Sequence, residues 1–168
     1  MLIFLIGMMG SGKTTLGKEL AAELNYSFVD LDAFIEEKEG RTIAEIFAQQ
    51  GQQGFRELEH KALQTIVANY SQAVVATGGG APCFFNNIQL MNQAGETIFL
   101  DVPIKMLVQR LSQSDLSTRP LLAGKTQSEL ISFLGKTLAD RRQFYVQAKH
   151  LVAMPPYTIN ALLKLLLL

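Results

Sequence analysis

The feature that most constrains this chain is a glycine-rich loop close to its N-terminus. Residues 7–14 read Gly-Met-Met-Gly-Ser-Gly-Lys-Thr, which fits the P-loop pattern of Gly, four residues and Gly-Lys-Ser/Thr. The apolar run Leu2–Ile6 before it is typical of a strand buried on both faces, and leucines at helical spacing follow over residues 13–25. Backbone N–H groups and a helix N-terminus attract anions, so this strand–loop–helix unit predicts a phosphate site rather than a plain glycine turn.

Two side chains of the loop have predicted tasks. Lys13 can reach the β- and γ-phosphates of a nucleotide, and the Thr14 hydroxyl can ligate Mg²⁺. We therefore expect a nucleotide with β- and γ-phosphates and one Mg²⁺ ion as cofactor. The residues expected to bind the nucleotide in this segment are Gly10, Ser11, Gly12, Lys13, Thr14 and Thr15.

Strands and helices are expected to alternate along the rest of the chain. Further strands are predicted at Ser27–Leu31, Ala73–Thr77, Thr97–Asp101 and His150–Met154. Helices are predicted at Ala33–Glu39, 42–50, 55–70, Asn87–Gln93, Ile104–Leu111, 126–148 and Thr158–Leu168. The helices at 42 and 126 open with the Thr-x-x-Glu spacing of a capping box. This alternation predicts an α/β fold of three α/β/α layers with a central five-stranded parallel sheet.

Residues 112–125 are the one long loop in this pattern, because they are polar and lack any period. No internal repeat, linker or boundary divides the chain, so we expect a single domain over residues 1–168.

Composition and charge exclude several classes of protein. Hydrophobic residues make up 48% of the chain and charged residues 18%, as in a globular domain. Residues 1–101 hold 6 basic and 12 acidic side chains (net −6), and residues 102–168 hold 9 basic and 3 acidic ones (net +6). The total of zero argues against a nucleic-acid partner, which usually requires an excess of Lys and Arg.

The two ends of the chain and its single cysteine bear on location. Cys83 is the only cysteine, which excludes an internal disulfide. Leu2–Ile6 has no basic segment before it, and the apolar residues 161–168 are too few to cross a bilayer, which needs about 20. We expect a cytoplasmic, monomeric protein with no membrane partner.

Candidate site residues follow the second and third predicted strands, at the edge where ligands bind in such sheets. The side chains of Asp30 and Asp32 could face the same side of the strand. One carboxylate could hold a metal-bound water or accept a proton, and the other could bind substrate hydroxyls. Alternatively, Asp32 could cap the following helix. The glycines at 78–80 form either a plain turn or a surface where a ligand can lie directly against the backbone.

Arginines are the remaining candidates for binding anions. Arg56 and Glu59, at i and i+3 of one helix, form either a surface ion pair or part of a site. Arg119 in the long loop either folds onto a transferring phosphoryl group or is solvated. Arg110, at the end of the preceding helix, is expected to be solvated.

Several other side chains are expected to be structural. His60 and His150 lack neighbours at metal-ligand spacing, and Cys83 has no evident activating base. Of the adjacent Arg141 and Arg142 on one predicted helix, one is expected to be exposed.

Together these motifs resemble the shikimate kinase family. In the family's order and spacing, over roughly residues 1–150, the matching features are Gly7–Thr14, Asp30-Leu31-Asp32, Phe55-Arg56 with Glu59, Gly78-Gly79-Gly80, Arg119-Pro120-Leu121-Leu122, and Arg141 four residues before Tyr145. Many families share the P-loop, whereas the later motifs are far more selective in combination.

The resemblance implies a P-loop kinase fold with a mobile lid at about residues 112–125. It also implies transfer of the ATP γ-phosphate to the 3-hydroxyl of shikimate, on the pathway to chorismate and aromatic amino acids. By resemblance, the catalytic residues would be Lys13, Asp30, Asp32 and Arg119, with Arg119 also binding ATP. The shikimate-binding residues would be Asp32, Arg56, Gly78, Gly79, Gly80 and Arg141, with Phe47 and Phe55 as apolar walls. Asp30 would reach Mg²⁺ through water, and Glu59 would orient its arginine neighbours.

The sequence departs from the family near its C-terminus. The family places adenine contacts where this chain reads Val152-Ala153-Met154-Pro155-Pro156-Tyr157, with few polar groups before the tyrosine. The apolar ending Leu165–Leu168 is expected to pack against the sheet or another chain.

Three alternatives remain on the residues alone. The chain could be a related kinase acting on gluconate or a nucleoside monophosphate, a nucleotide-dependent regulatory protein, or a purely structural domain. Two arginines available for a carboxylate favour an acidic acceptor.

Overall fold

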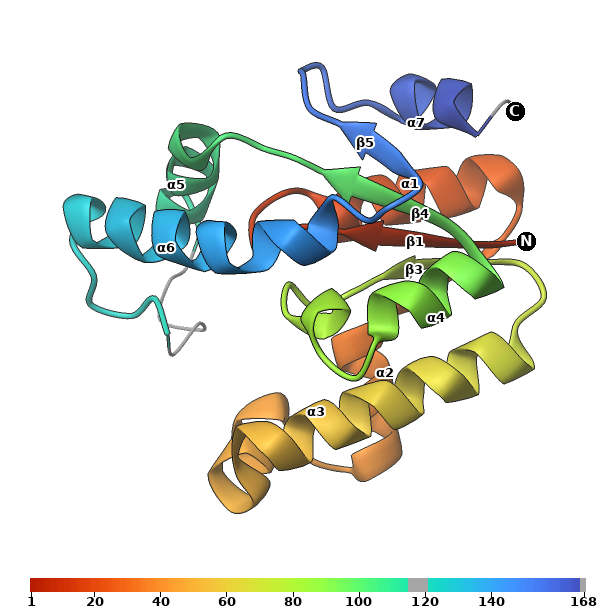
Figure 1. The fold of residues 1–168 in the computed structure, drawn as a ribbon, viewed down its shortest axis with the longest axis horizontal. Coiled ribbons are helices and arrows are strands. Elements are labelled where there is room, and N and C mark those ends of the chain that lie inside the picture. Colours follow the sequence, from red (N-terminus) through yellow and green to blue (C-terminus); the bar gives the residue numbers. More distant parts are fainter. Residues whose placement is uncertain (115–120, 167–168) are drawn as a thin grey trace.

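A five-stranded parallel sheet runs through the computed structural model, which describes residues 1–114 and 121–166 (Figure 1). Its strands are β1 (Leu2–Ile6), β2 (Ser27–Asp30), β3 (Ala73–Ala76), β4 (Gly95–Leu100) and β5 (His150–Val152), and their order is β2-β3-β1-β4-β5. Every pairing is parallel; Leu5 of β1, for example, lies between Ala76 and Ile98. The carboxyl ends of β2, β3 and β1 therefore meet at one edge.

Helices cover both faces of this sheet, so the predicted three-layer fold is confirmed. They are α1 (Lys13–Leu24), α2 (Leu31–Glu39), α3 (Ile43–Asn69), the short 3₁₀ helix η1 (Ala81–Cys83), α4 (Asn87–Ala94), α5 (Ile104–Ser112), α6 (Gln127–Tyr145) and α7 (Ile159–Leu165). α1 contacts α7, whereas α3, α4 and η1 contact one another and α6 contacts η1. Among the described residues, none of these helices has the length and apolarity needed to span a membrane.

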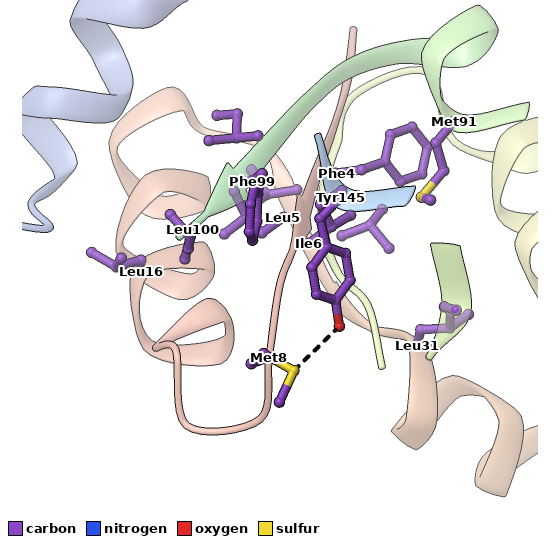
Figure 2. Close-up of a cluster of buried hydrophobic side chains, with 14 of the residues drawn as sticks. Phe4, Leu5, Ile6, Met8, Leu16, Leu31, Met91, Phe99, Leu100 and Tyr145 are labelled. Atoms are coloured by element: carbon purple, nitrogen blue, oxygen red, sulfur yellow. Dashed lines mark hydrogen bonds between the residues drawn. The ribbon is translucent and has the colours of Figure 1, made fainter. Parts of the chain in front are cut away.

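The core lies between these layers and is dominated by strand residues. All five residues of β1 and all four of β3 are buried, as expected for central strands covered on both faces. Figure 2 shows side chains of β1 and β4 meeting Leu16 of α1, Met91 of α4 and Tyr145 of α6. The sheet is therefore a rigid base for the loops at its carboxyl edge.

Most predicted elements are present, with shifted boundaries. Both capping boxes are formed, Thr42 with Glu45 and Thr126 with Glu129. The two helices predicted at 42–50 and 55–70 merge into α3, which is interrupted at Gly51, whose φ of 68° lies in the left-handed region.

Several predicted boundaries are wrong. α6 ends at Tyr145 rather than near residue 148, and β5 ends at Val152 rather than Met154, before two prolines that cannot donate ladder hydrogen bonds. The second strand ends at Asp30, one residue early, because the carboxylate of Asp30 caps α2 by accepting hydrogen bonds from the N–H groups of Asp32 and Ala33. The sequence pattern also did not predict η1.

Candidate active site

The P-loop joins β1 to α1 and holds its lysine in place. Gly10 and Gly12 have φ angles of 79° and 97°, which side chains other than glycine adopt rarely. The Lys13 ammonium donates hydrogen bonds to the carbonyls of Gly7 at 2.9 Å and Met8 at 2.8 Å, and the residue is only 9% exposed. The positive charge is thus fixed against the loop that the motif predicts to bind phosphate.

Arg110 corrects one expectation from the sequence. Instead of being a solvated charge at the end of α5, its Nη1 donates to the carbonyls of Gly10 at 3.2 Å and Ser11 at 3.1 Å. Its guanidinium also lies 5.7 Å from the ring centre of Tyr157. A second cation therefore supports the P-loop, and no pattern along the sequence indicated a contact across 100 residues.

Asp30 and Thr14 form a pair of oxygen donors beside the P-loop. The Thr14 hydroxyl donates to Oδ2 of Asp30 at 3.2 Å, while Oδ1 of the same carboxylate caps α2. Asp30 is therefore the helix cap, and the alternative that Asp32 caps this helix is wrong. The cap fixes Asp30 and leaves one of its oxygens facing Thr14.

Asp32 lies in the first turn of α2 and lines the same cleft. Burial, reinforced by the nearby negative charge of Asp30, raises the pKa of Asp32, while the charges of Lys13 and Arg56 act in the opposite direction. The carboxylate is therefore easier to protonate than an ordinary aspartate, and it lies within the influence of two site cations.

Arg56 and Glu59 of α3 form a buried ion pair, not a surface one. Nη1 of Arg56 donates to Oε2 of Glu59 at 2.7 Å, and their side chains are 10% and 1% exposed. Burial raises the pKa of Glu59 to about 7, although Arg56 opposes the shift. Nε of Arg56 and Oε1 of Glu59 are buried without a hydrogen-bond partner among the described residues. Such unsatisfied atoms are costly, which favours a role for the pair beyond stability.

The glycines at 78–80 leave room for four charged side chains. A Cβ on Gly80 would overlap Nη2 of Arg56, and one on Gly79 would lie 3.0 Å from Nη1 of Arg141. A Cβ on Gly78 would lie 3.2 Å from the Asp32 carboxylate and 3.3 Å from that of Glu59. None of the three has a positive φ. Close approach of charged groups, rather than a strained turn, is therefore what requires glycine here.

Near its C-terminal end, α6 carries Arg141 to this loop. Arg141 lies against Gly79, and Tyr145 one turn later is completely buried and donates from its hydroxyl to the Gly79 carbonyl at 2.6 Å. Arg142 points elsewhere: it is exposed and donates to both carboxylate oxygens of Asp101, at 2.9 and 2.6 Å. The expectation that one of the two adjacent arginines is exposed is thus confirmed.

The site residues surround one open cleft of about 1070 Å³. Its lining includes the predicted ATP-binding residues Gly10, Ser11, Gly12, Lys13, Thr14 and Thr15, and the predicted acceptor residues Asp32, Gly78 and Gly79. Arg56, Gly80 and Arg141 are not lining residues, but the two arginines lie against Gly80 and Gly79 at the edge of this lining. Both groups of predicted residues are therefore brought together.

Residues 157–160 also line this cleft, and the sequence did not indicate them as site residues. Tyr157, Thr158, Ile159 and Asn160 line it together with Arg110. The Tyr157 hydroxyl donates to the carbonyl of Asp101 at 2.9 Å. Polar groups are thus present at the end of the stretch where the family pattern predicts adenine contacts, at Tyr157, and just after it.

The structure places most of the remaining candidates from the sequence. Arg119 and part of the predicted lid lie outside the described residues. The rings of Phe47 and Phe55 lie 4.5 Å apart, with Phe55 buried and Phe47 37% exposed. Burial raises the pKa of Cys83 to about 11, which makes it a poor nucleophile. His60 contacts Asn87 and His150 contacts Glu96, as structural residues would.

Comparison with known proteins agrees with this geometry. The family model described as shikimate kinase matches residues 9–156. A shikimate kinase of Phocaeicola vulgatus is 51% identical over 149 residues, which are 89% of this chain and 84% of the relative.

Two solved structures extend the match to the fold. The crystal structure of shikimate kinase from Bacteroides thetaiotaomicron superposes with a TM-score of 0.91 at 42% identity, over 99% of this chain and 98% of that one. Shikimate kinase from Acinetobacter baumannii in complex with shikimate gives 0.85 at 33% identity, over 99% and 90% of the two chains.

Proposed function

Because the chain belongs to the shikimate kinase family, we propose that its cleft has a phosphate end, which binds the phosphates of ATP, and an acceptor end, which binds shikimate. The reaction is ATP-dependent phosphorylation of shikimate. In it, a hydroxyl oxygen of the acceptor, which we take to be the 3-hydroxyl, bonds to the γ-phosphorus. The bond between that phosphorus and the leaving ADP oxygen breaks, and the hydroxyl proton is released.

The phosphate end comprises Gly10, Ser11, Gly12, Lys13, Thr14 and Thr15. The Lys13 ammonium can exchange the carbonyls of Gly7 and Met8 for phosphate oxygens, which carry charge and hold an ammonium more strongly. Arg119 would add a second positive charge to the transferring group. We expect these cations to dominate the rate, since phosphoryl transfer depends on positioning and charge neutralisation.

Thr14 and Asp30 suit a magnesium ion. A hydroxyl and a carboxylate held 3.2 Å apart are hard oxygen donors, which Mg²⁺ prefers together with phosphate oxygens and water. Thr14 would ligate the ion directly and Asp30 through water. When bound, Mg²⁺ neutralises charge on the β- and γ-phosphates.

The acceptor end comprises Asp32, Arg56, the glycines at 78–80 and Arg141. Arg56 and Arg141 lie against adjacent glycines, so their planar guanidinium groups can converge on one carboxylate. Asp32 accepts hydrogen bonds from ring hydroxyls, and its raised pKa suits it to take the released proton. The apolar rings of Phe47 and Phe55 flank this end.

The observation that carries the assignment of an acidic acceptor is the convergence of two arginines on the glycine loop. Gluconate also has a carboxylate, whereas a nucleoside monophosphate would bring a phosphate and a base. In a regulatory ATP-binding protein, the buried Arg56–Glu59 pair would have no ligand to bind.

A coupled assay of ADP release tests the proposal. We expect ADP production that depends on shikimate, and much slower production with gluconate or a nucleoside monophosphate. ATP binding without shikimate-dependent turnover would contradict the proposed function and favour the regulatory alternative.

A further inference from the structure

Tyr145 is a buried polar group to which the reaction assigns no task. It is 0% exposed, and its ring lies 5.0 Å from that of Phe99, so the aromatic part is ordinary core. Its hydroxyl, however, does not reach solvent. Figure 2 shows the hydroxyl directed toward Met8 of the P-loop, whose sulfur is 3.7 Å away. A buried hydroxyl needs a hydrogen-bond partner, and the position of the hydroxyl determines which group that partner is.

The main partner is the glycine loop. A tyrosine hydroxyl has one hydrogen to donate, and the carbonyl of Gly79 at 2.6 Å is a far stronger acceptor than the thioether of Met8. The peptide between Gly79 and Gly80 is planar and trans, so fixing its carbonyl also fixes the direction of the Gly80 N–H. One hydrogen bond thereby sets the orientation of a peptide in the acceptor end.

Arg141 shares this location. It precedes Tyr145 by four residues, on the same face of α6. Its Nη1 lies against Gly79, so arginine and hydroxyl meet at one glycine. Burial raises the pKa of Tyr145 to about 12, with the charge of Arg141 acting in the opposite direction. The hydroxyl therefore keeps its proton, and stays a donor, at neutral pH.

We propose that Tyr145 is a positioning residue for the acceptor: its hydroxyl ties α6 to Gly79 and so holds Arg141 where its guanidinium can meet the carboxylate. This inference rests on the proposed function, in which Arg141 and Gly79 contact the acceptor. Arg56 reaches the same loop from α3. The contact between Tyr145 and Gly79 thus fixes the spacing of two arginines that come from different helices.

Tyr145→Phe provides the test, because it keeps the ring and removes only the hydroxyl. We expect the KM for shikimate to rise about fivefold to tenfold, as for a lost buried hydrogen bond, with the KM for ATP changed by less than about twofold. In an Arg141→Ala background, the same substitution should change the KM for shikimate by less than about twofold, because Tyr145 acts through Arg141.

Ile98→Val is the matched control. Ile98 is buried in β4 beside Phe99 and outside the cleft, and its truncation loosens the core to a similar degree. It should leave the KM for shikimate unchanged. An equal rise in both variants, an unchanged KM in Tyr145→Phe, or failure of Tyr145→Phe to fold while Ile98→Val folds would each overturn the proposal. A wild-type protein that neither binds nor phosphorylates shikimate would instead refute the proposed function, and this inference with it.

Discussion

The P-loop, which makes up most of the phosphate end of the cleft, is one contiguous segment, whereas the acceptor end is assembled from α2, α3, the glycine loop and α6. In the phosphate end, Lys13 is held by backbone carbonyls within six residues of itself. In the acceptor end, Arg56 and Glu59 are buried, and each has a polar atom with no hydrogen-bond partner in the part of the chain that the structure describes. Arg141 comes from the other half of the chain. The P-loop is therefore locally encoded, while acceptor selection depends on long-range packing. Substitutions at the two ends should have different kinetic signatures.

The largest effect is expected at the phosphate end. Lys13→Met removes the cation that we propose neutralises the transferring group, so kcat should fall by about a thousandfold. The KM for shikimate should change little, because the acceptor end stays intact. Steady-state kinetics with both substrates varied measures this. A large rise in the KM for shikimate would show that the two ends are not separable.

The next effect belongs to the acceptor arginines. Arg56→Ala and Arg141→Ala should each raise the KM for shikimate about a hundredfold, since each removes a charged hydrogen-bonding partner of the carboxylate. ATP binding, measured separately by titration, should persist. Equal loss of ATP binding would mean that these two residues do not belong to the acceptor end. Arg56→Ala should also destabilise the fold more than Arg141→Ala, because it leaves Glu59 buried and unpaired.

A smaller effect concerns protons at Glu59. Its pKa of about 7 lies above the ordinary 4.5, so the folded protein binds this proton more tightly than the unfolded chain does. The contribution of Glu59 to the free energy of unfolding therefore falls as pH rises from about 4.5 to about 7. A substrate carboxylate nearby should raise this pKa further, so shikimate binding takes up a proton. Affinity should then weaken above pH 7, by at most about tenfold per pH unit.

Calorimetric titration in two buffers of different ionisation enthalpy measures this proton uptake. Glu59→Gln should abolish it; uptake that persists in the variant would belong to Asp32, whose pKa is also raised. An affinity that does not depend on pH in the wild-type protein would contradict the expected coupling.

The smallest effect is expected at Arg142, beside Arg141 on α6. Its pair with Asp101 is exposed, so Arg142→Ala should lower the free energy of unfolding by less than about 1 kcal/mol. The KM for shikimate should stay within about twofold of wild type. Chemical denaturation and steady-state kinetics test this contrast with Arg141→Ala. Similar increases in the KM for shikimate in both variants would contradict it.

The same contrast explains what could be predicted from the sequence. The P-loop, the alternating elements and both capping boxes depend on local spacing, and the structure contains them. Whether Arg56 and Glu59 are buried depends on packing that their i, i+3 spacing does not reveal. Asp30 rather than Asp32 caps α2, because the strand ends one residue earlier than its apolar pattern suggests. Arg110 meets the P-loop across about a hundred residues, which no local pattern could indicate.

The most direct test of the account compares shikimate with its uncharged carboxamide as acceptors for the wild-type protein. The two differ only at the group that Arg56 and Arg141 are proposed to hold. We predict that kcat/KM for the carboxamide is at least about a hundredfold lower, mainly through KM, while the KM for ATP is unchanged. Equal kcat/KM for the two acceptors would contradict the claim that these arginines select the acceptor.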